Sequence, residues 1–401
     1  MTRIVDVSTF LLTAPGRHLG MADTQRSASL IQITTDDGFT GLGETYAGLY
    51  VPTLVPPCVD LYRPLLLDQD PHDIGESMRT LRLRSMRWGM VGLPVQVMSG
   101  IEMALWDLKA KRLNRPAYEV LGGLAQDSLR LYASAYASVF PPDETAKKVL
   151  HYVEKAFTAV KLATGFWNRP RAHDTPITQM IDEECSKVDA IRRAVGGGID
   201  LALDHHGANN PHAWSGDAAI DVIRALDPYR LMWFEQPCAS DDVEGYARLR
   251  AHVATPIAGG EDATTVHEIA RYLEQNALDV VQPDVAWMGI GATQEVFVRA
   301  RAHGIRATLH VAGTAVARAA NYHLAFAQPN CPIVEYQVEQ NPLFDELLAE
   351  PFEIRGGRLY PPAVPGFGVR LTRETLERFQ FVPRSWRVSH QPGGAAQGAA
   401  G

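Results

Sequence analysis

The spacing of hydrophobic and polar residues divides the chain into two parts. Residues 3–46 alternate as three strands, Ile4–Leu12, Ser29–Thr35 and Thr40–Thr45, with an Asp36-Asp37-Gly38 turn before the last. A turn of this kind between alternating segments is a strong hairpin signal. From residue 52 to 121 apolar residues recur at three- and four-residue intervals, most clearly in Val95–Lys111, which predicts helices. We therefore expect an α+β domain over residues 1–125.

From Leu129 onward, short apolar segments alternate with amphipathic helices. The predicted strands are Leu129–Ala137, Ala159–Ala163, Asp200–His206, Leu231–Pro237, Pro256–Glu261, Asp279–Asp284, Arg306–His310 and Pro332–Gln337. Eight such β-then-α units predict a closed parallel TIM-like (β/α) barrel over residues 126–345. An open doubly wound sheet would usually begin with a glycine-rich βα turn, which this sequence lacks. Residues 346–388 are expected to return to the first domain, and the Gly- and Ala-rich segment 389–401 is expected to be disordered.

The composition is that of a globular protein in the cytoplasm. Hydrophobic residues make up 46% and charged residues 21% of the chain, and no apolar run approaches the length that crosses a membrane. The net charge of −8 argues against a nucleic-acid partner. The four cysteines have no paired spacing, which indicates reduced thiols rather than disulfides or a zinc site.

Ionisable residues follow one another at the predicted strand ends. They are Lys161, Asp204 with His206, Glu235, Glu261, Asp284, His310 and Glu335. In a parallel barrel the carboxyl ends of the strands face the catalytic opening, so these side chains should converge. A single acid at a strand end is usually solvated or caps the next helix, but capping alone does not explain so long a succession.

Asp204, Glu235 and Glu261 belong to three adjacent predicted strands. Three carboxylates packed together would repel one another unless a cation lay between them. Ligation by oxygen alone suits Mg²⁺, so we predict a magnesium site. The alternative is that each acid caps its own helix, which fits Glu235 poorly because Gln236-Pro237 follows it directly.

Asp284 and His310 end neighbouring predicted strands. A carboxylate beside an imidazole sets its tautomer and raises its basicity, as a general base requires. A lone histidine in such a place is more often a satisfied core residue. With Asp284 beside it and acids opposite, the base is the favoured interpretation.

Together these residues resemble the enolase superfamily, within it the mandelate racemase-like subgroup. The resemblance rests on the segments AVKL at 159–162, LDHHG at 203–207, WFEQP at 233–237, IAGGE at 257–261, VQPDVAWMGIGATQE at 281–295, TLH at 308–310 and VEY at 334–336. It implies a barrel capped by an α+β N-terminal domain that the C-terminal segment completes. It also implies that the three acids bind Mg²⁺, that His310 and Asp284 form the base dyad, and that protonated Glu335 donates to the substrate carboxylate.

One departure from the subgroup indicates the reaction. Racemases of this kind carry Lys-x-Lys on the second strand, whereas this chain has Lys161-Leu162-Ala163, so a second base is missing. Asp204-His205-His206 is instead similar to the galactonate dehydratase pattern, which implies that His206 is the general acid for a departing β-hydroxyl. His206 could alternatively contact only the metal's surroundings or solvent. Lys161 could bind the substrate carboxylate or pair with Asp204.

The function we expect is Mg²⁺-dependent dehydration of a sugar acid, a small-molecule carboxylate, to a 2-keto-3-deoxy acid. Alternatives are a single-base epimerase or cycloisomerase on the same scaffold and a non-catalytic metal-binding protein. Substrate specificity should come from the loops Pro15–Arg26 and Tyr46–Val51, in which Arg17, His18, Tyr46 and Tyr50 are candidates. Arg82, Arg84, Arg87 and Trp88 could form an interface or contact a charged substrate. We expect a homo-oligomer without nucleic-acid or membrane partners.

Overall fold

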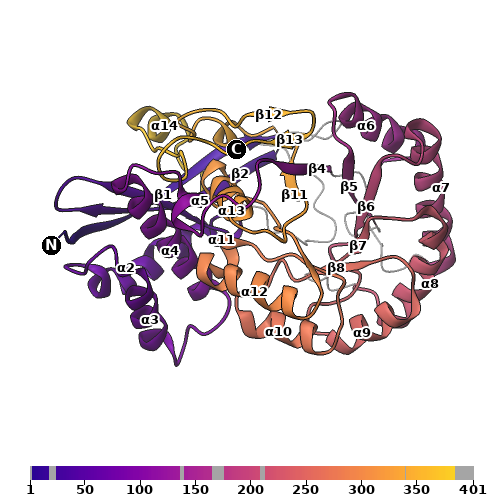
Figure 1. The fold of residues 1–401 in the computed structure, drawn as a ribbon, viewed down its shortest axis with the longest axis horizontal. Coiled ribbons are helices and arrows are strands. Elements are labelled where there is room, and N and C mark those ends of the chain that lie inside the picture. The colour runs from indigo at the N-terminus through magenta and orange to yellow at the C-terminus, as the bar shows by residue number, and fades with distance from the viewer. Residues whose placement is uncertain are drawn as a thin grey trace, which may run out of the picture.

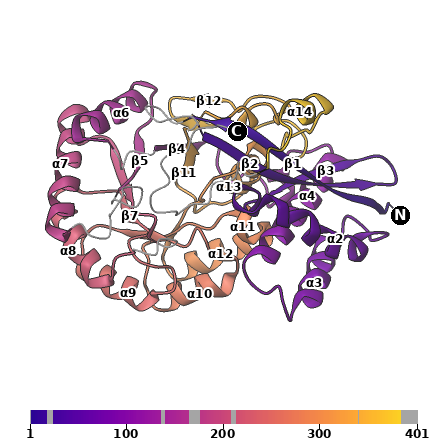
Figure 2. The ribbon, with the colours of Figure 1, turned by 180° about the vertical axis from the view of Figure 1, so that it is seen from behind.

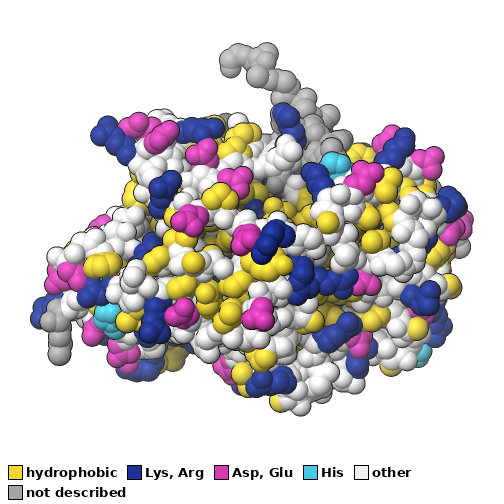
Figure 3. Space-filling view, turned by 45° about the horizontal axis from the view of Figure 1, so that its top comes forward, with side chains coloured by type: hydrophobic (Ala, Val, Ile, Leu, Met, Phe, Trp, Pro, Cys, Tyr) yellow, Lys and Arg dark blue, Asp and Glu magenta, His cyan; other side chains and the backbone are white. Residues whose placement is uncertain are grey.

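A computed structural model describes residues 2–17, 24–135, 140–164, 176–207, 213–338 and 340–383. Two parts lie side by side, with a small sheet and its helices at one end and a ring of strands and helices at the other (Figures 1 and 2). On the face in Figure 3, charged side chains of both signs are interspersed with hydrophobic ones. None of the helices among the described residues has the length and apolarity needed to cross a membrane.

The N-terminal sheet is an antiparallel meander in the order β1 (Ile4–Gly16), β2 (Thr24–Thr35), β3 (Thr40–Thr45). This confirms the predicted strands but corrects the loop expected at Pro15–Arg26. The β1–β2 ladder continues through Ala14 opposite Arg26 to Gly16 opposite Thr24, so both strands extend into the segment that was expected to be a loop. The other predicted loop, Tyr46–Val51, contains the short helix α1 (Ala47–Tyr50).

The helices of this domain pack against the meander or against one another. They are η1 (Pro52–Leu54), α2 (Val55–Leu66), α3 (Ile74–Ser85), α4 (Leu93–Arg112) and α5 (Ala117–Val120). Two glycines of β3 let α4 approach closely: a Cβ at Gly41 or Gly43 would lie 2.0 Å from the carbonyl oxygen of Ala104 or Gly100. Any side chain there would push the helix off the sheet, so the glycines set the position of α4.

Eight parallel strands form the barrel. They are β4 (Leu129–Ala135), β5 (Ala159–Ala163), β6 (Asp200–Asp204), β7 (Trp233–Glu235), β8 (Ile257–Gly259), β9 (Val280–Val281), β10 (Arg306–Ala307) and β11 (Val334–Gln337). Neighbours in the chain are neighbours in the sheet, and β11 pairs with β4. The Thr308 hydroxyl donates to the Ile333 carbonyl and links the segments around β10 and β11. The predicted barrel is therefore confirmed.

Helices connect the strands around the outside of the ring (Figure 1). They are α6 (Pro142–Glu154), α7 (Ile177–Val195), α8 (Gly216–Leu226), η4 (Asp227–Tyr229), α9 (Val243–His252), α10 (Val266–Glu274), α11 (Val285–Met288), α12 (Ile290–Ala302) and α13 (Ala315–Phe326). Side chains alternate along each strand, so one set packs against these helices and another fills the barrel. The inner cluster comprises Tyr132, Ala159, Ala202, Trp233, Ala258, Val280 and Ile333.

Several strands are shorter than predicted, and this places the polar residues just beyond them. Glu261, Asp284 and His310 follow the last residues of β8, β9 and β10 by two or three positions. Backbone hydrogen bonds continue past the strands, including His310 N–H to the Pro283 carbonyl at 3.2 Å. The side chains are consequently held by ordered backbone at the barrel opening.

The C-terminal segment returns to the first domain. After η5 (Pro342–Phe344), the hairpin β12 (Ile354–Arg355) and β13 (Arg358–Leu359) pairs antiparallel with β4. Beyond it, α14 (Arg373–Arg378) leads to Phe379, whose carbonyl accepts from Thr13 N–H at 3.0 Å. The limits 1–125, 126–345 and 346–388 remain predictions, and residues 389–401 lie outside the described residues.

Candidate active site

Three buried carboxylates meet at the opening of the barrel. Asp204 ends β6, Glu235 ends β7, and Glu261 follows β8. One oxygen from each lies within 4.8 Å of the other two. The predicted convergence of these acids is observed, because parallel strands bring their carboxyl ends to the same edge.

Two side chains that sequence reasoning missed hold Glu235. Its Oε2 accepts from Trp233 Nε1 at 2.8 Å and from Gln282 Nε2 at 2.7 Å. Trp233 lies two positions before Glu235 in the same strand, so both side chains face the same side. Gln282 stands in the same relation to Asp284. That two-residue spacing is the signal that could have found both.

Lys161 lies among the acids. Its Nζ is 3.1 Å from Asp204 Oδ2 and 3.4 Å from Glu335 Oε1, and it also pairs with Glu235 Oε1. Burial by itself lowers the pKa of Lys161, but the neighbouring carboxylates outweigh it and hold the pKa well above its ordinary value. The pairing with Asp204, one of the two roles considered for Lys161, is thus present, while contact with substrate remains a prediction.

His310 and Asp284 form the expected pair. His310 Nδ1 lies 2.7 Å from Asp284 Oδ2, and the other carboxylate oxygen, Oδ1, accepts from Asn321 Nδ2 at 2.9 Å and Ala286 N–H at 2.8 Å. Burial alone lowers the pKa of His310, but Glu261 and Asp284 raise it to about 10. Asn321, on α13, carried no sequence signal because its partner lies 37 positions away.

His310 Nε2 faces the acidic cluster, 3.9 Å from Glu261 Oε2. On the opposite side of the cluster, His206 Nε2 is 3.4 Å from Asp204 Oδ2. His206 has a left-handed backbone, φ 53°, and its N–H donates to Asp204 Oδ1 at 2.9 Å. The two imidazoles therefore flank the three carboxylates.

The two adjacent histidines differ in environment. His206 is about one third exposed (32%), and burial together with the Lys161 charge lowers its pKa to about 4. A general acid must be protonated, so that role for His206 remains a prediction. His205 is buried and stacks on Trp214 with ring centroids 3.8 Å apart, so its ring contributes to packing.

Glu335 approaches the same opening from β11. Its Oε2 accepts from Val311 N–H at 2.9 Å, and its Oε1 faces Lys161. The side chain is positioned beside the cluster as expected. Its role as a hydrogen-bond donor to substrate remains a prediction.

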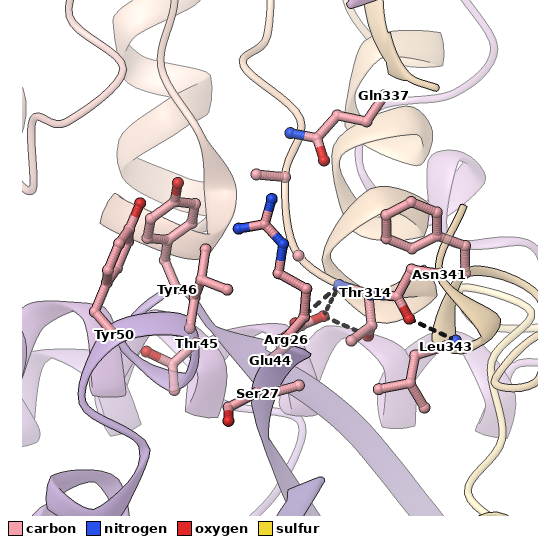
Figure 4. Close-up of a pocket in the computed structure, with 15 residues that line it drawn as sticks. Arg26, Ser27, Glu44, Thr45, Tyr46, Tyr50, Thr314, Gln337, Asn341 and Leu343 are labelled. Atoms are coloured by element: carbon pink, nitrogen blue, oxygen red, sulfur yellow. Dashed lines mark hydrogen bonds between the residues drawn. The ribbon is translucent and has the colours of Figure 1, made fainter. Parts of the chain in front are cut away.

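A pocket lies next to these residues, between the N-terminal domain and the barrel. Arg26, Tyr46 and Tyr50 line it from the N-terminal domain, and Gln337 and Asn341 line it from the barrel side (Figure 4). The ring of Tyr46 is 5.9 Å from that of His310, which joins the pocket to the catalytic opening. Tyr46 and Tyr50 are thus placed where a substrate could reach them.

Other residues considered for specificity lie elsewhere or are not described. Arg17 pairs with Gln340 through the backbone, and His18 lies outside the described residues. Arg82, Arg84, Arg87 and Trp88 are exposed on or just after α3, and none of them lines the pocket. Arg26, which does line the pocket, is the last residue of the loop predicted to give specificity, but it was not among the candidates named there.

The chemistry of the donor set fits a hard divalent cation. The three carboxylates supply oxygen ligands only, and all three are buried, where their mutual repulsion favours a bound cation. Hydrogen bonds from Trp233 and Gln282 fix the orientation of Glu235, and the His206 N–H fixes that of Asp204. Asp204, Glu235 and Glu261 could therefore hold Mg²⁺.

Known families and proteins are similar to most of this chain. Residues 7–122 match the mandelate racemase/muconate lactonizing enzyme N-terminal domain, and residues 144–375 match the enolase C-terminal domain-like family. D-gluconate dehydratase of Thermoproteus tenax is 29% identical over 90% of this chain and 72% of its own. D-galactonate dehydratase of Ralstonia nicotianae is 31% identical over 89% of this chain and 92% of its own.

Not every relative is a dehydratase. D-galactarolactone cycloisomerase of Agrobacterium fabrum is 29% identical over 94% of this chain and 99% of its own. The solved structure of 3,6-anhydro-D-galactonate cycloisomerase from Zobellia galactanivorans superposes with a TM-score of 0.81 and 26% identity, covering 94% of this chain and 99% of the other.

Proposed function

Because this chain is an enzyme that belongs to the enolase superfamily, we propose that it is a Mg²⁺-dependent acid sugar dehydratase. In this proposal the enzyme removes the C2 proton of an aldonate-type carboxylate and eliminates the C3 hydroxyl group. The enol that results ketonises to a 2-keto-3-deoxy acid. Similarity to D-gluconate and D-galactonate dehydratases supports the proposal.

The observation that carries it is the placement of two imidazoles on either side of the acidic cluster. His310 lies at the Glu261 end and His206 at the Asp204 end. A carboxylate substrate held over the cluster would have one imidazole for the C2 proton and another near the leaving hydroxyl. Dehydration needs both functions, and each belongs to a different strand of the barrel.

His310 is the proposed base, because a cation held by the three acids would oppose the carboxylate charge that raises the pKa of this imidazole to about 10 in the free site. Its Nε2 points into the opening, while Nδ1 is held by Asp284, which Asn321 in turn orients. A proton accepted at Nε2 leaves an imidazolium that the Asp284 carboxylate stabilises. His206 is the proposed acid, and an anionic substrate beside it would raise its pKa from the low value of the free site.

Asp204, Glu235 and Glu261 would hold the metal, which when bound would neutralise the substrate carboxylate and so acidify the adjacent C–H group. Lys161 supplies a fixed positive charge at the same place. Glu335, if protonated, would donate to a carboxylate oxygen of the substrate. The cap residues Arg26, Tyr46 and Tyr50 would contact the far end of the sugar acid.

A single-base cycloisomerase is the second candidate, because relatives with that activity cover nearly the whole chain. It would use His310 in the same way but would not need His206 as an acid. A two-base racemase is disfavoured because Ala163 replaces the second lysine of the Lys-x-Lys pattern. A non-catalytic metal-binding protein would have no need of the complete Asp284–His310 pair.

The experiment incubates the chain with Mg²⁺ and a panel of aldonates, aldarates and their lactones in deuterated buffer. We expect 2-keto acid from at least one aldonate. His310→Asn should lower both C2 deuterium exchange and keto-acid formation by 10²-fold or more, the roughly 10²–10⁴-fold range of general-base catalysis. His206→Asn should keep exchange at C2 and lose keto acid, because only the departure of the hydroxyl depends on it.

Other results would separate the alternatives. Lactone opening or exchange without keto acid favours the cycloisomerase or epimerase. Exchange retained in His310→Asn rejects His310 as the base. His252→Asn, a substitution of an exposed histidine in the last turn of α9, is the matched control and should behave as wild type. No turnover of any member of the panel would support the non-catalytic alternative.

A further inference from the structure

The short helix α11 lies between the N-terminal domain and the proposed base. It comprises only Val285–Met288 and begins directly after Asp284, whose side chain caps it. It packs against α4, where the two parts of the molecule meet (Figures 1 and 2). One turn of helix has little stability of its own. The position of α11 therefore depends on its contacts with neighbouring elements.

Ala286 of α11 has hydrogen bonds on both sides. Its N–H donates to Asp284 Oδ1 at 2.8 Å, and the other oxygen of that carboxylate lies 2.7 Å from His310 Nδ1. Its carbonyl oxygen accepts from two groups of the N-terminal domain, the Tyr46 N–H at 3.2 Å and the Ser99 hydroxyl at 2.9 Å. One residue thus joins the N-terminal domain to the carboxylate that holds the proposed base.

The Ser99 hydroxyl has one hydrogen and two carbonyl acceptors. The Gln96 oxygen, one turn earlier in α4, lies 2.6 Å away, and the Ala286 oxygen lies 2.9 Å away. A hydroxyl hydrogen shared between two acceptors keeps its side chain in one rotamer. Ser99 and Ala286 are both buried, so water cannot take the place of the hydroxyl if it is removed.

A second contact with α4 fixes the other end of α11. Gly289, which follows the helix, has a φ of 88°. A Cβ at Gly289 would lie 2.2 Å from Glu102 Oε2 and 3.7 Å from the Cα of Ser99. The other oxygen of Glu102 accepts from Gly291 N–H at 3.0 Å. Because the two elements approach so closely, α4 cannot move without moving α11.

We propose that Ser99 is a positioning residue for His310, acting through Ala286 and Asp284. The inference rests on the proposed function, in which His310 is the base. The N–H and the carbonyl of Ala286 are joined through a single Cα, so holding the carbonyl limits the movement of the N–H. That N–H in turn keeps the Asp284 carboxylate from rotating away from the imidazole.

One wall of the pocket is supported by the same turn. Tyr46 lines the pocket, and its N–H shares the Ala286 carbonyl with Ser99. Its ring lies 4.7 Å from that of Trp287 in α11 and 5.9 Å from that of His310. The contacts of α11 therefore hold the pocket wall and the base in register with each other.

Ser99→Ala tests the proposal, and Ser85→Ala is the matched control. Ser85 is also buried on a helix of the N-terminal domain, and its hydroxyl donates to a carbonyl of its own helix, that of Leu81 at 2.8 Å. Its other partner is Tyr62, within the same domain. The two variants therefore remove the same group, but only Ser99→Ala removes a contact with the barrel. Circular dichroism and thermal unfolding check that each variant is folded.

The kinetic measurement uses the panel of aldonates, aldarates and lactones with Mg²⁺ in deuterated buffer. We expect Ser99→Ala to lower C2 deuterium exchange and kcat about tenfold while KM stays near wild type, because the base is displaced and the substrate contacts remain. Ser85→Ala should match wild type. Ser99→Thr keeps a hydroxyl at this position and should restore the rate.

A spectroscopic measurement needs no substrate and so does not depend on the proposed function. In a chain labelled with ¹⁵N at histidine, the proton between His310 Nδ1 and Asp284 should give a low-field NMR signal, identified by its absence in His310→Asn. We expect the same signal in wild type, Ser85→Ala and Ser99→Thr. In Ser99→Ala it should move upfield or broaden, because the carboxylate is held less firmly.

Three outcomes would overturn the inference. An unchanged signal in Ser99→Ala would show that other contacts hold Asp284. Equal losses in Ser85→Ala would assign the effect to the stability of the N-terminal domain. A Ser99→Thr variant as slow as Ser99→Ala would assign it to the space at this position. A changed signal in Ser99→Ala, with neither exchange nor keto acid in wild type, would instead reject the proposed function and keep the positioning role.

Discussion

At the scale of single residues, two kinds of side chain support the site: some lie on or just after the barrel strands, and others reach it from a helix. Trp233 supports Glu235 from the same strand, and Gln282 supports it from the end of β9, two strands away. Each lies two positions before a predicted site residue, a spacing that the period of a strand explains. Asn321 reaches Asp284 from α13 and has no such relation. Positioning groups of the second kind become visible only when the helices are in place around the barrel.

Asn321→Leu should slow turnover without weakening substrate binding. The amide holds Asp284 at 2.9 Å, and without it the carboxylate can rotate away from His310. We expect kcat to fall about tenfold, KM to stay near wild type, and the acidic limb of the pH–rate profile to shift. Asn330→Ala removes a comparable amide, one that donates to the Phe297 carbonyl, and should change none of these. An unchanged kcat would remove Asn321 from the positioning of the base.

Substitution in the acidic cluster should weaken magnesium binding. Glu261→Gln removes one of three converging carboxylates, and a neutral amide binds Mg²⁺ less well. Isothermal titration calorimetry should show at least a tenfold rise in Kd. Glu295→Gln, at an exposed carboxylate on α12, serves as the control. If wild type, Glu261→Gln and Glu295→Gln bind Mg²⁺ with equal affinity, the metal binds elsewhere.

At the scale of elements, the start of α13 is held by the N-terminal domain. Glu44 of β3 accepts hydrogen bonds from Thr314 N–H, the Thr314 hydroxyl and Ala317 N–H at 2.6–3.0 Å. The first backbone amides of a helix have no acceptor within the helix. Here the Glu44 carboxyl group is the acceptor for two of them, those of Thr314 and Ala317. Because Glu44 also lines the pocket, the same contact fixes one wall of it.

The Glu44 contact should make stability depend on pH. Burial, opposed by the hydrogen bonds from Thr314 and Ala317, raises the pKa of Glu44 from 4.5 to about 7. Between these values the folded chain holds a proton that the unfolded chain releases, so stability falls as pH rises through this window and then levels off. The fall should amount to about 3 kcal/mol.

Urea unfolding of wild type and Glu44→Gln at pH 5 and pH 8 measures the effect. The wild-type free energy of unfolding should drop more between the two pH values than that of the variant, which has no proton to lose at this position. Parallel pH dependence in the two proteins would show that Glu44 titrates normally.

At the scale of the whole molecule, α4 and the C-terminal segment join the two domains. Asp107 of α4 accepts from Leu42 N–H of β3 and from Phe367 N–H of the C-terminal segment, each at 2.9 Å, and pairs with Lys111 at 2.5 Å. On another face of α4, the Ser99 hydroxyl donates to the Ala286 carbonyl at 2.9 Å. The chain end and the first domain are thus held together by one fully buried carboxylate.

Asp107→Ala should loosen the C-terminal segment. Two buried amides and a lysine lose their acceptor, which should cost about 3 kcal/mol. We expect a lower thermal midpoint and earlier cleavage within residues 346–383 in limited proteolysis. Asp217→Ala, at a side chain that is 86% exposed, should match wild type in both measurements. Equal protection of the segment in Asp107→Ala would show that other contacts hold it.

The sequence by itself determined the strands, the barrel and the chemical character of the opening. These follow from local rules: hydrophobic periodicity predicts each element, and parallel strands with short connections bring their carboxyl ends together. For that reason Asp204, Glu235 and Glu261 could be placed in one cluster before any coordinates. Their roles, and those of His206, His310 and Glu335, still await the kinetic tests.

Only the tertiary structure decided which distant residues support and surround that opening. Glu44 and Thr314 are 270 positions apart, and Arg26 of β2 lines the same pocket as Gln337 and Asn341 near the other end of the chain. Contacts of this range depend on how the N-terminal domain sits on the barrel. That docking depends on many small packing contacts, such as α4 on Gly41 and Gly43. Such contacts produce no periodic pattern of hydrophobic residues from which they could be predicted.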